Sequence, residues 1–209
     1  MNKFQQTREI VRYSLKYISG KTLDLGAGSA KYRNIIKQGS SEYISFDVAP
    51  SENVDVVGDV LNLPFRNDSF DTVISTQVLE HVEKPWIMIK EIRRVLKKDG
   101  ICILTAPFMV PYHADPNDYF RYTIEGMKSL LRNENFETIE CDGYGRIFSV
   151  MAEFVRFSWF NPYEKPKMGS WKITRFIAKT AQFLDRFSRS KIIYNNVYII
   201  AKKAEDIRN

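Results

Sequence analysis

Glycines and carboxylates recur in this chain at spacings that suit the binding of a nucleoside-type ligand. Residues 23–32 read LDLGAGSAKY, in which Gly26 and Gly28 would let backbone N–H groups approach a ligand that a larger side chain would keep away. Asp47 follows Gly28 by 19 residues, at the end of a short apolar segment, where its carboxylate can accept from both hydroxyls of a ribose. Together these residues predict a site for an adenosine-type ligand.

Proton transfer is the second chemistry that the sequence allows, and its candidates are few. The chain contains two histidines, His81 in LEHV and His113 in the segment 111–123, PYHADPNDYFRYT. A histidine beside a hydroxyl substrate can remove the proton of that hydroxyl near neutral pH. We favour His113 as the base or as a substrate anchor and His81 as a structural residue of a turn, while the role of Glu80 stays open.

The segment around His113 allows a second interpretation. Asp118, Arg121 and Tyr122 can join His113 in a polar brace that fixes the loop. Arg121 can instead hold an acidic group of the substrate through two parallel hydrogen bonds. The sequence leaves both interpretations open.

The elements that must position these residues alternate between strand and helix from residue 8 to about 135, which favours a parallel sheet with helices on both faces. The clearest helix begins at Pro85 and is expected to carry Lys97 and Lys98 in its last turn and to end at Gly100. We expect another helix from Thr123 and strands at residues 42–46, 54–57, 71–75, 101–105, 138–141 and 196–201. Such a sheet brings the carboxyl ends of its parallel strands to one edge, where a ligand crevice opens.

Five parts of the sequence together resemble the class I S-adenosylmethionine (SAM)-dependent methyltransferases, and within them the type 11 group. They are LDLGAGS at 23–29, Asp47, GDVLNLPFRNDSFD at 58–71, VLEHV at 78–82 and LKKDGICILTAPF at 96–108. The resemblance implies a single doubly wound, Rossmann-like α/β domain over residues 1–209, with a seven-stranded mixed sheet whose last strand is antiparallel. It also implies SAM as the cofactor. A nicotinamide-binding oxidoreductase is the rival, but its fingerprint requires glycine or alanine three residues after Gly28, where this chain has Lys31.

The resemblance assigns a part of SAM to each candidate residue. Asp24 would orient the glycine loop and accept from the ammonium of the methionine part, and Asp47 would take the ribose hydroxyls. The other cofactor contacts are expected from the N–H groups of Ala27, Gly28 and Ser29 to the carboxylate, from Val48 beside Asp47, from Asp59 and Val60 to the adenine, and from Thr76 and Gln77 to the methionine part. The acceptor is expected to contact Tyr119, Arg121 and Tyr122, beside His113.

Residues 147–193 separate the last two expected strands and are too many for a hairpin, which indicates an inserted helical lid or substrate subdomain. They contain an aromatic segment at 148–160, a turn at 161–170 and an amphipathic basic helix at 171–187. We expect the helix to cover the pocket and to bury its apolar stripe. Peripheral contact with an anionic membrane surface, with Trp159 and Trp171 at the interface, and an oligomer contact are the alternatives.

The composition of the chain predicts the size of its core, its location in the cell and the state of its thiols. A hydrophobic content of 44% over 209 residues supports a substantial core, and the absence of a leader pattern or a long apolar run predicts a cytoplasmic protein. Cys102 and Cys141 fall in expected strands and predict buried thiols. The net charge of +6 allows an anionic partner without requiring one.

Two classes of ligand are not expected from the motifs of the chain. We expect no metal, because no Cys/His cluster has metal-ligand spacing. We expect no specific nucleic acid, because Ser75 is not followed by an Asn/Asp-Pro-Pro-aromatic motif.

These observations predict a methyltransferase that moves a methyl group from SAM to an oxygen of a small molecule, a sugar or a glycan. The acceptor rests on analogy with type 11 relatives. A membrane-associated quinone or lipid methyltransferase, which would act on a lipid-linked acceptor, is one alternative. A SAM-binding module without transferase activity is the other.

Overall fold

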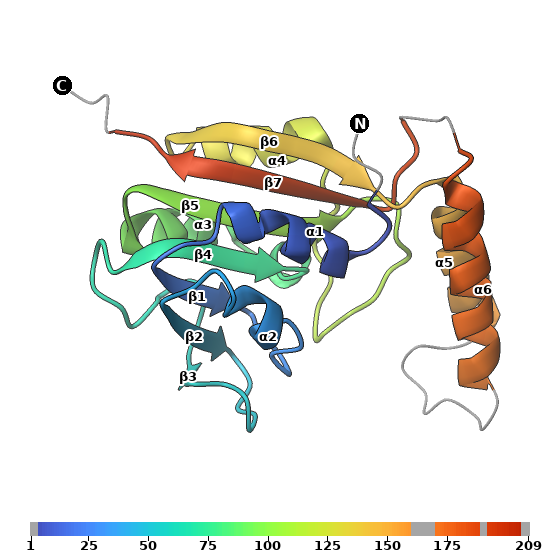
Figure 1. Cartoon of the computed structure of the whole chain (residues 1–209), viewed down its shortest axis with the longest axis horizontal. Helices are drawn as coiled ribbons and strands as arrows, with labels where there is room; N and C mark the ends of the chain where they lie inside the picture. Colours follow the sequence, from blue (N-terminus) through green and yellow to red (C-terminus); the bar gives the residue numbers. More distant parts are fainter. Residues whose placement is uncertain (1–3, 160–169, 189–191, 206–209) are drawn as a thin grey trace.

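The computed structural model describes residues 4–159, 170–188 and 192–205, in which seven strands form one sheet (Figure 1). The strand order is β3-β2-β1-β4-β5-β7-β6, with β7 antiparallel to both of its neighbours and the other pairs parallel. The bounds are β1 Lys21–Leu25, β2 Glu42–Asp47, β3 Val56–Val57, β4 Phe70–Thr76, β5 Leu96–Pro107, β6 Phe136–Tyr144 and β7 Asn196–Lys203. The seven-stranded mixed sheet with an antiparallel last strand is confirmed.

Helices cover both faces of this sheet (Figure 1). The bounds are α1 Thr7–Tyr13, α2 Arg33–Ile36, α3 Pro85–Val95, α4 Ile124–Arg132, α5 Ile147–Trp159 and α6 Ser170–Asp185, with short 3-10 helices η1 Ser14–Lys16 and η2 Leu79–His81. Two apolar clusters form the core, one with α1 and α2 and the other with α3 and α4. Val73 and Ile74, which are successive in β4, belong to different clusters, because successive side chains of a strand point to opposite faces.

The boundary between α3 and β5 differs from the expected one. Helix α3 ends at Val95, and Lys97 and Lys98 belong to β5 rather than to the last helical turn. Leu96 pairs with Phe70 of β4, and the Lys97 ammonium bonds Asp71 Oδ1 at 2.8 Å. Pairing with the neighbouring strand therefore ends the helix earlier than the basic residues and Gly100 suggest.

The two cysteines lie in strands, as expected, and both are free thiols. Cys102 in β5 is fully buried, and Cys141 in β6 is partly buried. Burial raises the pKa of both thiols, that of Cys141 to about 12. Neither thiol is therefore activated as a nucleophile.

Helices α5 and α6 stand side by side beyond the carboxyl ends of the parallel strands (Figure 1). The Asp185 carboxylate, at the end of α6, accepts from the N–H groups of Arg146, Phe148 and Ser149 at 2.9, 2.8 and 3.1 Å. Those N–H groups belong to the beginning of α5, where they have no partner within the helix. Asp185 is buried and therefore joins the end of one helix to the beginning of the other.

The larger apolar side chains of α6 are mostly exposed, so the expectation of a buried apolar stripe is wrong, although Ala181 is buried and Ile177 is partly buried. Phe176 is 72% exposed and Phe187 is 70% exposed, and Met151 and Phe154 of α5 are also more than half exposed. Residues 161–169 of the turn expected at 161–170 and the side chains of Trp159 and Trp171 lie outside the described residues, and Ser170 begins α6. Among the described residues, no helix has the length and apolar content needed to cross a bilayer.

Candidate active site

The glycine loop follows β1 and has left-handed backbone conformations at both of its glycines. Gly26 has φ of +74° and Gly28 has φ of +55°, a region that favours glycine over other residues. A Cβ atom at Gly26 would lie 2.3 Å from Val78 Cγ2, whereas a Cβ atom at Gly28 would meet nothing within 4 Å. Gly26 thus lets the loop pack against η2, and Gly28 leaves open space at the surface of the loop.

The N–H groups of this loop bind the neighbouring strand β2. The Gly26 and Ala27 N–H groups both donate to Phe46 O, at 2.8 and 3.0 Å, and the Gly28 N–H donates to Asp47 Oδ2 at 2.7 Å. Of the three N–H groups expected to bind the carboxylate of SAM, those of Ala27 and Gly28 therefore already have a partner. Helix α2 begins only at Arg33 and has four residues, so the loop does not lie directly at a helix N-terminus.

Asp47 is the residue that joins the loop to the end of β2. Besides the Gly28 bond, its Oδ1 accepts from the Ala49 N–H at 3.0 Å. Val48, beside it, is 70% exposed, as a side chain that is to contact a ligand must be. Asp59 is also exposed and accepts from the Leu61 N–H at 2.8 Å. The neighbouring Val60 is partly buried and packs against the core.

Asp24 is buried at the carboxyl end of β1, where the sequence predicted a contact with the ammonium of SAM. The Tyr43 hydroxyl donates to Asp24 Oδ2 at 2.6 Å. Burial raises the pKa of Asp24 to about 6, although the Tyr43 hydrogen bond lowers it. A cationic ligand group at this carboxylate would supply the charge that favours its ionised form.

The raised pKa of Asp24 predicts a measurable pH dependence of stability. The folded protein binds this proton more tightly than the unfolded chain does, so the contribution to stability is present at low pH and is lost as the pH rises through about 6. Between pH 5 and pH 8 the unfolding free energy of the wild type, relative to Asp24→Asn, should fall by about 1.4 kcal/mol. Urea denaturation of both proteins at the two pH values measures this difference. A pH-independent difference would contradict the assignment.

Gln77 follows β4 in a strained backbone conformation, with φ of +57°. Its N–H donates to Thr105 O at 2.9 Å, and its side-chain Nε2 donates to Thr105 Oγ1 at 3.1 Å and to Tyr144 Oη at 3.4 Å. Thr76, directly before it, ends the strand beside Thr105 of β5. Residues held in this way at a strand end are typical of functional sites.

A cavity of 610 Å³ lies next to this position, between the sheet edge and the α5/α6 pair. It is lined by residues of the glycine loop region, the sheet edge, α1 and both helices, among them Arg8, Lys31, Tyr144, Glu153, Arg156 and Asn196. The Tyr144 hydroxyl also pairs with Thr7 Oγ1 at 2.9 Å, so α1 and the end of β6 meet at the cavity wall. The cavity is large enough for a small-molecule ligand.

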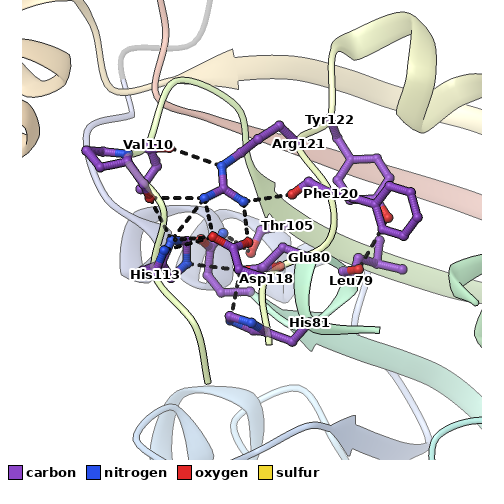
Figure 2. Close-up of polar contacts among 12 residues, drawn as sticks. Leu79, Glu80, His81, Thr105, Val110, His113, Asp118, Phe120, Arg121 and Tyr122 are labelled. Atoms are coloured by element: carbon purple, nitrogen blue, oxygen red, sulfur yellow. Dashed lines mark hydrogen bonds and ion pairs between the residues drawn. The ribbon is translucent and has the colours of Figure 1, made fainter. Parts of the chain in front are cut away.

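The loop between β5 and α4 is held together by Arg121 (Figure 2). Its guanidinium forms a bidentate ion pair with Asp118 and donates to Pro111 O and Val110 O, both at 3.0 Å, and to Phe120 O at 2.8 Å. The Asp118 side chain is 1% exposed. These contacts support the polar brace rather than an Arg121 that is available to a substrate.

Tyr122 and Tyr119, the other two residues expected to contact the acceptor, differ in their exposure and in their contacts. Tyr122 is buried, and its hydroxyl donates to Leu79 O at 3.3 Å, so it supports the loop from inside the core rather than contacting an acceptor. Tyr119 has an exposed ring, and its N–H donates to Glu80 O at 2.7 Å. Of the three, only Tyr119 presents an open side chain.

Glu80, His81 and His113 form a cluster where η2 meets this loop (Figure 2). The Nε2 atoms of both imidazoles lie 3.8 Å from Glu80 Oε1, and the two rings are perpendicular with centroids 5.3 Å apart. Glu80 raises the pKa of His113, as does the carbonyl of Pro111, while partial burial lowers it. The sequence did not reveal that the two histidines meet, because 31 residues separate them and only the path of the loop brings them together.

Comparison with known proteins shows which family part of the chain is similar to. Residues 23–104 match the family described as a methyltransferase domain. An uncharacterized methyltransferase of Mycobacterium tuberculosis is 30% identical over 99 residues, which cover 41% of this chain and 39% of the relative. The chain therefore spans about two fifths of the length of such curated relatives.

Two solved structures show the same fold at low sequence identity. A SAM-dependent methyltransferase from Archaeoglobus fulgidus has a TM-score of 0.61 at 18% identity, with 96% of each chain covered. The [4+2]-cyclase SpnF has a TM-score of 0.63 at 18% identity, over 94% of this chain and 79% of that one. Likeness at this level concerns the fold alone. Residues 23–104 are thus similar to the type 11 methyltransferase domain, and the described sheet has the fold of the class I SAM-dependent methyltransferases.

Proposed function

We propose that this protein transfers a methyl group from SAM to an oxygen of a small-molecule or sugar acceptor. The observation that carries the proposal is the contact between the Gly28 N–H and Asp47 Oδ2 at the carboxyl edge of the sheet, where the ligand crevice of a doubly wound fold opens. Asp24 and Gln77 line the same edge, and the Glu80, His81 and His113 cluster begins two residues after Val78, which packs against the loop. Cofactor and proton-transfer groups are thus neighbours.

The residues of the chain would position the reactants and stabilise the charge that forms during the transfer. SAM supplies the methyl group from its sulfonium. Asp47 would hold the ribose and Asp24 the ammonium, so that the reacting atoms meet within about 3 Å, which can supply a large part of the rate enhancement. His113 would take the proton of the acceptor hydroxyl, and the Glu80 carboxylate would stabilise the imidazolium that results. Oxygen gains the methyl group, sulfur keeps the electron pair, and His113 later releases the proton to solvent.

The α5/α6 pair would form the acceptor side of the site. It contributes Glu153, Arg156 and Gln182 to the cavity wall opposite Lys31. The cavity is lined mostly by polar residues, which suits a hydroxylated acceptor better than a purely apolar one. In this proposal the α5/α6 pair would belong to the lid or substrate subdomain that the sequence predicts over residues 147–193.

Calorimetric titration with S-adenosylhomocysteine (SAH), with NAD as the control ligand, tests the cofactor. Micromolar binding of SAH alone is the expected result, and binding of NAD instead would refute the proposal. Incubation with radiolabelled SAM and fractionated host metabolites then tests transfer. His113→Ala should keep SAH affinity within twofold and lower turnover by 100-fold or more, as loss of a general base does. Equal turnover of the variant would remove His113 from the mechanism.

The exposed apolar face of α5 and α6 favours a second candidate, a methyltransferase that acts on a lipid-linked or quinone acceptor at a membrane surface. Phe176, Phe183 and Lys179 are exposed on α6, and Arg186 and Phe187 are exposed directly after its end. Aromatic side chains beside basic ones are typical of helices that lie on anionic membranes.

Vesicle sedimentation tests this candidate. The protein should sediment with vesicles of phosphatidylglycerol and phosphatidylcholine but not with phosphatidylcholine alone, and Phe176→Ser with Phe187→Ser should abolish the effect. Ile139→Ser, an exposed residue on β6, is the matched control and should leave binding intact. Equal sedimentation of the double variant would exclude α6 as the contact.

A further inference from the structure

Glu80 is a buried carboxylate for which the described residues provide no hydrogen-bond partner. Its side chain is 0% exposed, and neither Oε1 nor Oε2 has a hydrogen bond. An ionised carboxylate is costly to bury unless it is paired or coordinates a metal ion. The imidazoles of His81 and His113 are its closest charged or basic neighbours, but at 3.8 Å both are beyond hydrogen-bond distance. The carboxylate therefore faces a position that calls for a positive charge.

The two imidazoles are oriented so that their Nε2 atoms face Glu80. His81 Nδ1 lies 2.5 Å from Asn117 O, and His113 Nδ1 lies 3.0 Å from Pro111 O. A carbonyl oxygen can only accept, so in the neutral His81 ring Nδ1 carries the hydrogen and Nε2 carries a lone pair. The Pro111 carbonyl favours the same tautomer of His113, whereas Arg121 Nη2, 3.3 Å from His113 Nδ1, can only donate and favours the other. A backbone carbonyl on the second nitrogen is also what fixes the tautomer of a metal-ligating histidine.

Three groups that can each offer an electron pair thus lie close together. One ligand atom from each of the three residues lies within 4.8 Å of the others. Ligands of Zn²⁺ lie about 2.0–2.2 Å from the ion, which places neighbouring ligand atoms about 3.4 Å apart in a tetrahedral site. The separations of 3.8 Å between each Nε2 and Glu80 Oε1 are too long for direct hydrogen bonds, and all three ligand atoms, which lie within 4.8 Å of one another, would have to move closer together to share an ion.

We propose that Glu80, His81 and His113 bind a divalent transition-metal ion of the Zn²⁺ type. Two imidazoles and one carboxylate are a donor set that such ions prefer, and three protein ligands leave at least one position open, as in catalytic sites. The expectation from sequence of no metal is thereby replaced. The ligands come from η2 and from the loop that Arg121 and Asp118 hold in place.

The function of the ion rests on the proposed methyl transfer. The open position would take the acceptor oxygen, and the charge of the ion would lower the pKa of the bound hydroxyl, so that the proton leaves to solvent. The oxygen lone pair then forms the bond to the methyl group as the bond from sulfur breaks. In the metal-loaded protein His113 is a ligand, and the ion replaces it as the group that makes the acceptor oxygen anionic.

Metal titration of the full-length, tag-free protein after treatment with EDTA tests the site directly. Calorimetry with ZnCl₂ and the visible absorption of CoCl₂ should show one ion per chain at micromolar affinity or better. Glu80→Gln and His81→Gln should each weaken binding 100-fold or more, and Glu83→Gln, exposed on the same segment, should not change it. No ion at 1:1 stoichiometry, or unchanged affinity in Glu80→Gln, would overturn the proposal.

A titration of the same preparations with SAH separates this proposal from the proposed function. His81→Gln that has lost the ion should still bind SAH as the wild type does, which also shows that the variant is folded. Metal binding without SAH binding would refute the cofactor assignment and leave the metal site standing. SAH binding without metal binding would refute the metal site alone.

Thermal unfolding gives an independent test, because the effect of Glu80→Gln on the melting temperature should differ between EDTA and ZnCl₂. In EDTA, Glu80→Gln should melt at or above the temperature of the wild type, because it removes an unpaired buried charge. With ZnCl₂ the wild type should gain stability and Glu80→Gln should not. A Glu80→Gln variant that melts below the wild type in EDTA, with no effect of ZnCl₂ on either, would show that a proton on His113 rather than an ion compensates Glu80.

Discussion

Asp47→Ala is expected to weaken SAH binding about 100-fold. A charge-assisted hydrogen bond contributes roughly 1.5–3 kcal/mol, and the loss of both bonds to the ribose hydroxyls removes about 3 kcal/mol of binding free energy, which is about two orders of magnitude in Kd. The fold should persist, because Asp47 is only partly buried and its partners in the structure are the N–H groups of Gly28 and Ala49, which can bind water instead. Calorimetric titration with SAH measures the effect.

Glu52→Ala is the matched control for this experiment. Glu52 is an exposed carboxylate five residues further along the same loop, so its removal changes the net charge equally. It should leave SAH affinity within twofold. An Asp47→Ala variant that retains the affinity of the wild type would show that another group holds the ribose.

Asp118→Ala should lower the free energy of unfolding by about 3 kcal/mol. The substitution leaves the Arg121 guanidinium without its bidentate partner and removes the acceptor of the His113 N–H, and breaking one half of a largely buried ion pair is more costly than removing both. The loop that places His113 should also open, so turnover and metal affinity should fall together. Urea denaturation and hydrogen exchange at residues 108–122 measure these effects.

Asn117→Ala provides the comparison within the same loop. The Asn117 side chain is exposed, and its contact with His81 is made by the backbone carbonyl, which alanine retains. Its unfolding free energy should stay within about 0.5 kcal/mol of the wild type, as is usual for surface substitutions. If Asp118→Ala proved equally mild, the loop would not depend on the Arg121 pair.

The residues expected to bind the cofactor could be proposed from the sequence because their signals are local. Gly26 and Gly28 are required by the backbone of one short loop, and Asp47 follows at a distance set by a single βαβ unit. The positions of most strands could be predicted for a similar reason, since each strand is a short apolar segment with its own periodicity. Even so, the N–H groups of Ala27 and Gly28 bind β2, which no local pattern indicates.

The surroundings of the residues expected at the acceptor could not be predicted, because they depend on contacts between residues that are distant in the sequence. Arg121 and Tyr122 were expected at the substrate, but the guanidinium binds carbonyls of its own loop and the tyrosine hydroxyl binds Leu79 O. Both facts require the folded path of the loop. Likewise, the apolar stripe of α6 is visible in the sequence, but whether it faces the core or solvent is decided by how α6 packs against α5 through Asp185.

The sequence by itself determined the class of fold, the glycine loop and the acidic residue that follows it, because backbone conformation and hydrophobic periodicity are properties of short segments. Only the tertiary structure decided that Glu80, His81 and His113 meet. The number of residues between them in the sequence does not say how far apart they lie in the folded chain. A buried carboxylate without a hydrogen-bond partner can be recognised only once the side chains around it are in place.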